Sequence, residues 1–269
     1  MKYRFIDLFA GAGGLSEGFI RAGYEPIAHI EMDHYACDSL KTRAAFHYLK
    51  ENGKLEIYEE YLKNKKEKTD GSWLWNQVPK SVIDSVIQEA IGKETLPSLF
   101  ERVDKLCNGK PVDMIIGGPP CQAYSVAGRA RLGKKIEEDP RNDLYKFYVE
   151  FLKRYKPKMF VFENVLGIFT AKGGEPFRDL IRLVRELDYN IDFREQIASQ
   201  HGVLQKRHRV IIVGWQNKRD TQEDTSYHYP YLLEEQMPYK MMRDLFCDLP
   251  IVKAGEGTLC GIVHYTKPL

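Results

Sequence analysis

The chain has 269 residues, of which 43% are hydrophobic and 29% charged, and its formal net charge is +2. The length suits one large domain, and the composition is that of an ordinary globular protein. No apolar run approaches the ~20 residues of a membrane span, and no signal peptide follows Met1. A cytoplasmic protein without a membrane partner is expected, and the small net charge does not identify a nucleic-acid partner or exclude one.

The five cysteines, Cys37, Cys107, Cys121, Cys247 and Cys260, are scattered along the chain. No pair has the close spacing of a zinc or redox site, and their number is odd. Reduced thiols and no structural metal are therefore predicted.

The first 33 residues predict a strand, a turn, a helix and a second strand. YRFIDLF is a continuous apolar strand candidate, and AGAGG follows it as a tight glycine turn. LSEGFIRAG has the spacing of a helix that Gly23 ends, and EPIAHIEMD is a strand ending on acidic residues. This order is typical of parallel strand pairing.

Residues 41–109 predict an inserted helical region. Residues 41–71 are highly charged and favour helix, and both SVIDSVIQEAIG and LPSLFERVDKL have helical spacing. The charged positions are interpreted as a solvated face.

The alternation of strands and helices then resumes with VDMII, NDLYKFYVEFLKRY, PKMFVFENV and PFRDLIRLVRELD. Two more strand candidates, YNIDFREQIA and RHRVIIVGW, follow with no room for a helix between them. They must pair antiparallel, because a parallel crossover needs a dozen or more residues. The predicted fold is α/β, with a mostly parallel sheet, one antiparallel strand near its edge and a helical insertion.

The glycine turn after the first strand is a candidate ligand site. Gly11, Gly13 and Gly14 would let a ligand approach backbone N–H groups at a helix N-terminus. Glu31, at the end of the second strand, can bind both ribose hydroxyls of an adenosine. Ser16 replaces the third glycine of a dinucleotide fingerprint, so an adenosine ligand fits better than a pyrophosphate. A plain tight turn is the alternative, which the acid and the strand order make weaker.

A second candidate site begins at GGPPCQAYS, residues 117–125. A core cysteine needs neither rigid prolines nor glycines beside it, so Cys121 is predicted to point out of the core toward a ligand. Glu163 and Asn164 end a later parallel strand, and ligands of open α/β sheets bind at the carboxyl ends of strands. Cys121 and Glu163 can therefore converge.

Three polar residues, Gln205, Arg207 and Arg209, alternate and are predicted to share one face of a strand. The arginines could instead be an edge-strand charge pattern, and Glu163 could cap a helix. The joint occurrence of all these features makes both alternatives weaker.

DLFAGAGG, IEMD, GGPPCQAYS, ENV and QKRHR, in this order, resemble the DNA (cytosine-5)-methyltransferases of bacterial restriction–modification systems. The match covers roughly residues 3 to 215, except the helical insertion. The resemblance implies a Rossmann-like fold that uses S-adenosylmethionine. It also implies methyl transfer to carbon 5 of a flipped-out cytosine in double-stranded DNA.

The catalytic residues that the resemblance implies are Cys121, Glu163, Asn164, Gln205, Arg207 and Arg209. The Cys121 thiolate would attack carbon 6 of the ring, and Glu163 would hold N3 and the exocyclic amine. Arg209 would hold the base and Glu163, while Arg207 would steady the loop that carries the thiol.

The cofactor residues implied in the same way are Phe9, Ala10, Gly11, Gly13, Gly14, Leu15, Glu31, Met32, Pro120 and Leu144. Phe9 would lie against the adenine, and Met32 stands where the family often has a bulky side chain over it. The family also has an acidic residue near the end of the third strand. Ile91 is the candidate for that place, and it lacks the acid. No metal is implied.

The DNA-binding residues implied are Gln122, Ser125, Arg129 and Arg131. A base in a duplex must be flipped out before its carbon 6 can be attacked. Residues 126–141 would form a mobile loop that closes over DNA, with Gly128 and Gly133 as hinges and basic residues for phosphate. A plain solvated loop is the alternative.

Residues 1–220 are predicted to form the catalytic domain, and residues 221–269 the lead-in to a target-recognition domain. No stretch after Trp215 resembles the family's closing motifs. A truncated chain, or half of a split enzyme with a separate C-terminal half as partner, is expected. The alternatives for function are a transfer-RNA cytosine methyltransferase of the same family and a non-catalytic cofactor or nucleic-acid binding module.

Overall fold

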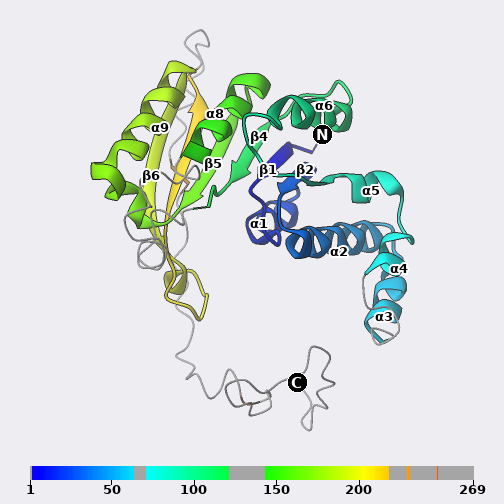
Figure 1. The fold of residues 1–269 in the computed structure, drawn as a ribbon. Coiled ribbons are helices and arrows are strands. Elements are labelled where there is room, and N and C mark those ends of the chain that lie inside the picture. The colour runs from blue at the N-terminus through cyan, green and yellow to red at the C-terminus, as the bar shows by residue number, and fades with distance from the viewer. Residues whose placement is uncertain (1, 64–70, 121–142, 218–228, 231–246, 248–269) are drawn as a thin grey trace.

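The computed structural model describes residues 2–63, 71–120, 143–217, 229–230 and 247 (Figure 1). The strands are β1 (Arg4–Leu8), β2 (Glu25–Glu31), β3 (Val86–Gln88), β4 (Met114–Gly117), β5 (Met159–Asn164), β6 (Tyr189–Ile197) and β7 (His208–Gln216). The helices are α1 (Gly14–Arg21), α2 (His34–Glu51), α3 (Leu55–Lys63), α4 (Ser72–Trp75), α5 (Lys80–Asp84), α6 (Leu96–Cys107), α8 (Leu144–Tyr155) and α9 (Glu175–Glu186).

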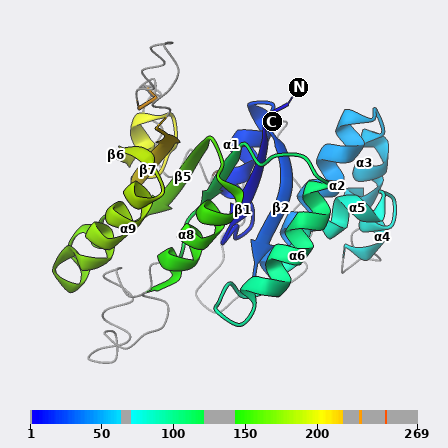
Figure 2. The same cartoon turned by 90° about the horizontal axis from the view of Figure 1, so that it is seen from above.

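The strands form one seven-stranded sheet in the order β3-β2-β1-β4-β5-β7-β6. Helices α1 and α2 lie on one side of the sheet, and α6, α8 and α9 lie on the other (Figure 2). None of the helices in the described residues combines the length and apolarity that a membrane crossing requires.

One strand, β7, runs antiparallel to both of its neighbours, β5 and β6. Only a short loop with a 3₁₀ turn (Ala198–Gln200) separates β6 from β7, which is too short for a parallel crossover. The other described strand pairs are parallel. The mostly parallel sheet with one antiparallel strand near its edge is confirmed.

The prediction that SVIDSVIQEAIG is helical is wrong over its second half. Val86–Gln88 forms β3, which pairs parallel with β2 through His29 and Val86. A three-residue strand is too short for its period to be read from sequence, whereas α6 has twelve residues and was predicted correctly. The region 41–109 thus contributes a strand to the sheet as well as helices.

The inserted helices α3, α4 and α5 have a small core of their own. Ala45 and Leu49 of α2 pack there with Tyr61, Leu74 and Val78. This satellite core is separate from the larger cluster of buried residues beneath α6, α8 and α9.

The fully buried Tyr148 of α8 links the two strands that position the candidate site. Its hydroxyl lies 3.0 Å from the carbonyl oxygens of Ile115 in β4 and Val161 in β5. A hydroxyl has one proton to donate, so it is shared between these two acceptors. These two contacts fix the position of β4 relative to β5. Glu163 lies near the carboxyl end of β5, and Pro120 follows the carboxyl end of β4.

Candidate active site

The glycine turn between β1 and α1 has a left-handed backbone. Phe9, Gly11 and Gly13 have φ angles of 56°, 54° and 83°. A Cβ atom at Gly11 or Gly14 would meet no atom within 4 Å, so both backbones border open space. At Gly13 a Cβ would instead lie 2.9 Å from Leu40, so this glycine is needed for packing against α2.

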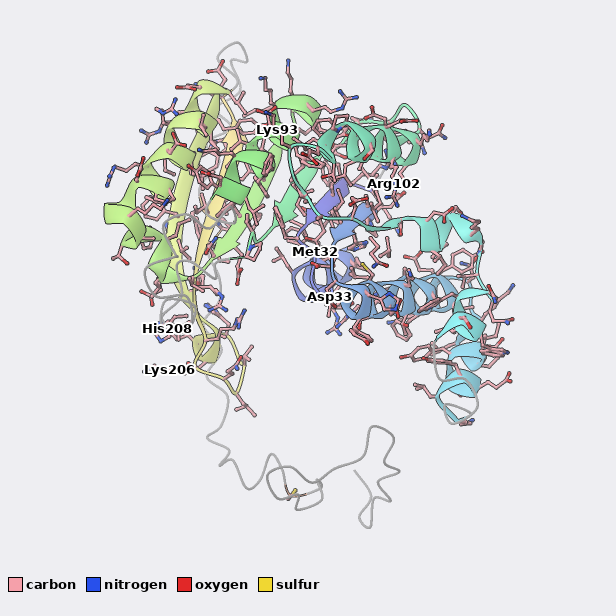
Figure 3. The ribbon with its side chains drawn as sticks, in the orientation of Figure 1. Met32, Asp33, Lys93, Arg102, Lys206 and His208 are labelled. Carbon is pink, nitrogen blue, oxygen red and sulfur yellow. The ribbon has the colours of Figure 1, made fainter. Side chains whose placement is uncertain are left out.

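Glu31 is fixed beside this turn at the carboxyl end of β2. Its Oε2 accepts a hydrogen bond of 2.8 Å from the backbone N–H of Gly11. Its Oε1 accepts bonds of 2.8 and 2.9 Å from the N–H groups of Met32 and Asp33. Oε1 already accepts two hydrogen bonds, but Oε2 can accept a second one, so the group is held in place and can still bind one hydroxyl. The exposed Met32 lies at the same end of the strand (Figure 3).

Two of the predicted cofactor side chains pack into the protein rather than toward open space. Ala10 is buried with Cys37 and Leu40, and Leu15 packs against the cluster containing Phe5. The buried Ala10 can contribute only backbone groups to a ligand, whereas Leu15 is partly buried. Pro120 follows β4 and Leu144 begins α8, both at the carboxyl edge of the sheet.

An acidic residue that the sequence analysis missed follows β3 directly. The backbone N–H of Glu89 donates to the carbonyl oxygen of Glu31 at 2.9 Å, so the two glutamates end neighbouring strands. Ile91 is 7% exposed and belongs to the main core. In the sequence, Glu89 directly follows VIQ. An acid at this position indicates a cofactor contact only if VIQ is first recognised as a strand.

The predicted convergence of Glu163 and Arg209 is present. Arg209 Nε lies 2.7 Å from Glu163 Oε1, and an Arg207 nitrogen lies 3.8 Å from the same oxygen. The side chains of Glu163 and Arg209 are 27% and 22% exposed, so the ion pair is only partly open to solvent.

The backbone after β4 also contacts this carboxylate. A Cβ atom added to Gly118 would lie 2.8 Å from Glu163 Oε2, so any larger residue there would displace the carboxylate. The buried Asn164 has its Nδ2 3.4 Å from the carbonyl oxygen of Pro119, and its Oδ1 accepts from the N–H of Val165. Asn164 therefore ties the proline segment to β5, and its role is to position rather than to face a ligand.

The prediction that Gln205, Arg207 and Arg209 share one strand face is wrong for the first two. Strand β7 begins at His208, and the N–H of Arg207 bonds to the carbonyl of Gln205 at 2.9 Å in a turn. Alternation along a face requires extended backbone, which this turn lacks. Gln205 is exposed, and only the long Arg207 side chain reaches Glu163. Lys206 and His208 mark this loop in Figure 3.

The remaining predicted residues, Cys121, Gln122, Ser125, Arg129 and Arg131, lie outside the described residues, as does the loop of residues 126–141. Pro120 is the last described residue before Cys121. In the described part of the chain, no group of three or more His, Cys, Asp or Glu side chains could hold a metal ion.

Comparison with known proteins assigns the family. The model for C-5 cytosine-specific DNA methylases matches residues 3–73 and 88–252. The type II methyltransferase M.Bpa9945I of Bacillus paralicheniformis is 33% identical over 94% of this chain and 62% of its own length. M.DdeI of Desulfomicrobium norvegicum is 31% identical over 94% of this chain and 49% of its own length. This chain thus spans about half to three fifths of these relatives.

Solved structures agree on the fold. A protein described as a DNA modification methyltransferase encoded within an Escherichia coli prophage has a TM-score of 0.57 and 25% identity. The alignment covers 93% of this chain and 56% of that one. The Entamoeba histolytica methyltransferase EhMeth, at 17% identity and a TM-score of 0.51, shares the fold over 87% of this chain and 57% of its own. Since the family model matches well over half of the sequence, the chain belongs to the C-5 cytosine-specific DNA methylase family.

Proposed function

We propose that this chain handles the cofactor and the target base in methyl transfer to carbon 5 of cytosine in DNA. The observation that carries the proposal is the shared sheet edge. The glycine turn follows β1, and Glu31 is the last residue of β2. Gly118 follows β4, and Glu163 lies near the end of β5. In the sheet, β4 lies between β1 and β5. A cofactor bound at the first pair would thus lie beside a base bound at the second.

The residues around the turn fit S-adenosylmethionine, which supplies the methyl group when bound. The open space at Gly11 and Gly14 leaves backbone accessible to a ligand, and Glu31 Oε2 can accept one more hydrogen bond, from a ribose hydroxyl. Glu89, rather than Ile91, is proposed as the acidic residue that the family has near the end of the third strand. Its carboxylate would accept a hydrogen bond from the adenine amine. Phe9 and Met32 would border the adenine.

Glu163 and Arg209 are proposed to hold the flipped cytosine. The carboxylate accepts a hydrogen bond from the exocyclic amine and stabilises the proton at N3 as the ring becomes an enamine. The Arg209 guanidinium 2.7 Å away fixes the carboxylate and compensates its charge.

Cys121 is proposed to be the nucleophile. Its thiolate would add to carbon 6, which makes carbon 5 nucleophilic. Carbon 5 would then take the methyl group that S-adenosylmethionine supplies, with cleavage of the S–CH3 bond and S-adenosylhomocysteine as the leaving group. Loss of the carbon 5 proton then expels the thiolate and restores the aromatic ring. The contact of Gly118 with Glu163 supports a short distance between this segment and the base site.

The type II relatives support a role as the modification enzyme of a restriction–modification system. The separate C-terminal half expected from sequence stays a prediction, tested by adding such a half and measuring site-specific methylation.

The substrate is tested by incubating the full-length gene product with methyl-labelled S-adenosylmethionine and either duplex DNA or transfer RNA. Label in 5-methylcytosine of DNA is expected. Label confined to transfer RNA would establish the alternative substrate. Cofactor binding without transfer to either would establish the non-catalytic alternative.

A further inference from the structure

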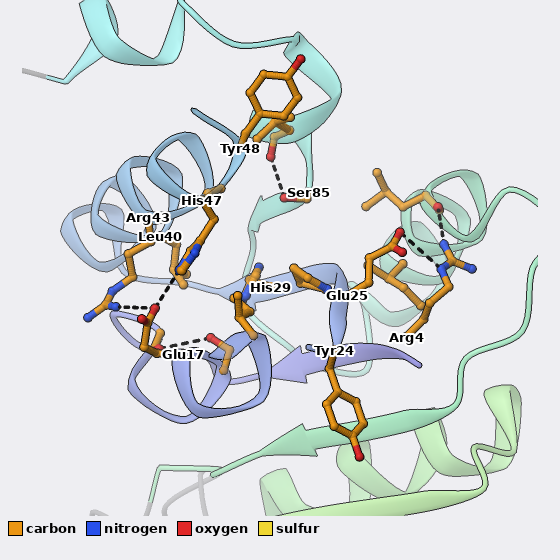
Figure 4. A pocket seen from close by; sticks show the side chains of 18 of the residues that line it. Arg4, Glu17, Tyr24, Glu25, His29, Leu40, Arg43, His47, Tyr48 and Ser85 are labelled. Carbon is orange, nitrogen blue, oxygen red and sulfur yellow. Dashed lines mark hydrogen bonds and ion pairs between the residues drawn. The ribbon is translucent and has the colours of Figure 1, made fainter. Parts of the chain in front are cut away.

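A pocket separate from the candidate base site lies between α1 and α2, over β2, with a volume of about 430 Å³ (Figure 4). Ile20 of α1 and Leu40 of α2 face it from the two helices, and Ile27 and His29 lie beneath them on β2. Neither Gly11 nor Glu31 lines it. The volume is within the ~300–1,000 Å³ of known ligand sites. We refer to it as the α1–α2 pocket.

The polar group in the floor of the pocket is the imidazole of His29, which is 4% exposed. Its ring stands edge-on to that of Phe5, with centroids 6.2 Å apart. Nδ1 has no hydrogen-bond partner among the described residues. A buried polar atom without a partner is costly and uncommon, so a hydrogen bond to this ring would be stabilising.

The imidazole is uncharged under ordinary conditions. Burial lowers the pKa of His29 to about 4, and the nearby charge of His47 acts in the same direction. A neutral imidazole has one nitrogen that donates and one that accepts. The floor therefore offers a single, uncharged hydrogen-bonding group.

The charges at the rim of the pocket are already paired. Glu17 lies 2.9 Å from His47 Nε2 and 3.0 Å from Arg43. Burial alone would raise the pKa of Glu17, but the hydrogen bonds from His47 and Arg21 and the charges around it lower that pKa to about 2. At the opposite end, Lys2 pairs with Glu51 and Arg4 lies 3.8 Å from Glu25. Each charged side chain that lines the pocket in the described structure thus has an opposite charge beside it, which disfavours an ionic ligand.

We propose that the α1–α2 pocket binds an uncharged heteroaromatic molecule whose ring nitrogen pairs with His29. The aliphatic walls from Ile20, Ile27 and Leu40 suit the faces of a ring, and the imidazole suits one polar atom on its edge. Gly13 and α1 border both this pocket and the cofactor turn, but Gly11 and Glu31 do not line the pocket. The proposal does not depend on the reaction proposed above.

The test uses three bicyclic probes of the same outline: benzimidazole, indole and indene. Benzimidazole has both an N–H and an acceptor nitrogen, indole has only the N–H, and indene has neither. Titrations of the 269-residue chain at about pH 7.5, well above the pKa of His29, are followed by the ring nitrogen resonances of its histidines. Benzimidazole is expected to shift the His29 resonances and to bind at least about tenfold more tightly than indene.

Three variants assign the site. In His29→Phe, which keeps the ring but not its nitrogens, the preference for benzimidazole over indene should be lost. Ala44→Phe places a ring inside the pocket and should abolish binding of all three probes. Glu31→Gln, at the cofactor turn, should leave benzimidazole binding unchanged.

Thermal unfolding of each variant shows whether it is folded, and His29→Gln provides a second test if His29→Phe is not. Absence of saturable benzimidazole binding would overturn the proposal. So would an unchanged preference in both folded His29 variants, or loss of binding in Glu31→Gln.

Discussion

At the scale of single residues, the candidate base site depends on one carboxylate that several segments hold. Arg209 contacts Glu163 from the start of β7 and Arg207 from the turn before it, while the backbone of Gly118 lies against it from the segment after β4. The carboxylate is therefore preorganised before any substrate binds, which is the condition for efficient positioning.

Replacing Gly118 by alanine should displace this carboxylate. The added Cβ would lie 2.8 Å from Glu163 Oε2 and 3.1 Å from its backbone oxygen. A shift of about 1 Å at a reacting group can cost ~100-fold in rate, so methyl transfer should fall by about that factor. Affinity for S-adenosylmethionine should stay within about twofold, measured by calorimetry.

Gly18→Ala is the matched control, because Gly18 lies on the exposed side of α1 and a Cβ added there would meet no atom within 4 Å. It should transfer methyl groups at the rate of the unmodified protein. Full activity in Gly118→Ala would show that Glu163 does not need this geometry.

Glu89 gives a prediction about the cofactor. If its carboxylate accepts the adenine amine, Glu89→Gln should weaken S-adenosylmethionine binding about tenfold, since a hydrogen bond to a charged group contributes ~1.5 kcal/mol or more. Calorimetric titration of both proteins measures this. Glu94→Gln, in the exposed turn before α6, should bind like the unmodified protein. Equal affinities for all three would contradict the assignment.

Asp7 gives a prediction about pH. Burial raises its pKa from 3.8 to about 8, the charge of Glu31 adds to the rise, and the Ser16 hydroxyl opposes it. The unfolded chain releases this proton near pH 4 while the folded protein retains it. The contribution of Asp7 to stability is therefore lost as pH rises from about 4 to 8.

Asp7→Asn removes this titration. Its free energy of unfolding, relative to that of the unmodified protein, should increase by ~2–4 kcal/mol between about pH 5 and pH 8, because only the unmodified protein loses stability over this range. Urea unfolding of both proteins at several pH values measures the difference. A difference that is constant with pH would mean that Asp7 is ionised in the folded state.

At the scale of elements, the antiparallel strand β7 fits between β5 and β6 because of a close approach at Gly214. A Cβ atom there would lie 1.9 Å from a ring carbon of Phe160 on β5. Gly214→Ala forces either the ring or the strand to move and should lower the free energy of unfolding by ~1–3 kcal/mol. Gly92→Ala, whose nearest contact would be 3.9 Å, should change it by less than ~0.5 kcal/mol. Equal stabilities of the two variants, measured in urea, would contradict this packing.

The elements show what sequence can predict here. Helices α6, α8 and α9 have twelve residues each and clear helical periods, so their positions follow from sequence. Strand β3 has three residues inside a helix-favouring region, and its pairing with β2 depends on tertiary contact. Missing β3 had a direct consequence, because Glu89 could not be recognised as an acid at a strand end.

The candidate site shows the same limit. Glu31 and Glu163 could be placed at one sheet edge from sequence, because the carboxyl ends of parallel strands share an edge. Arg209 reaches Glu163 from the start of the antiparallel β7, and its role was implied by the family resemblance. The position of Gln205 and Arg207 before β7, and the inward packing of Leu15, depend on a turn and on core contacts that no local pattern specifies.

At the scale of the whole molecule, the two halves of the candidate site come from opposite parts of the sheet. The residues proposed for the cofactor lie after β1, on β2 and after β3, and those proposed for the base lie on β5 and at the start of β7. Strand β4 joins these halves and leads directly to Pro120 and Cys121. We propose that the Cys121 thiol attacks a base held by Glu163 at this junction.

The most direct measurement is covalent trapping on duplex DNA in which every cytosine is 5-fluorocytosine, with S-adenosylmethionine and the full-length gene product. Fluorine cannot leave carbon 5 as a proton does, so the thiol cannot be eliminated after methyl transfer. A denaturation-resistant adduct is expected, with mass spectrometry placing the methylated base on Cys121. It should be absent with Cys121→Ser and strongly reduced with Glu163→Gln. An adduct on another residue, or undiminished methyl transfer by Cys121→Ser, would contradict the mechanism.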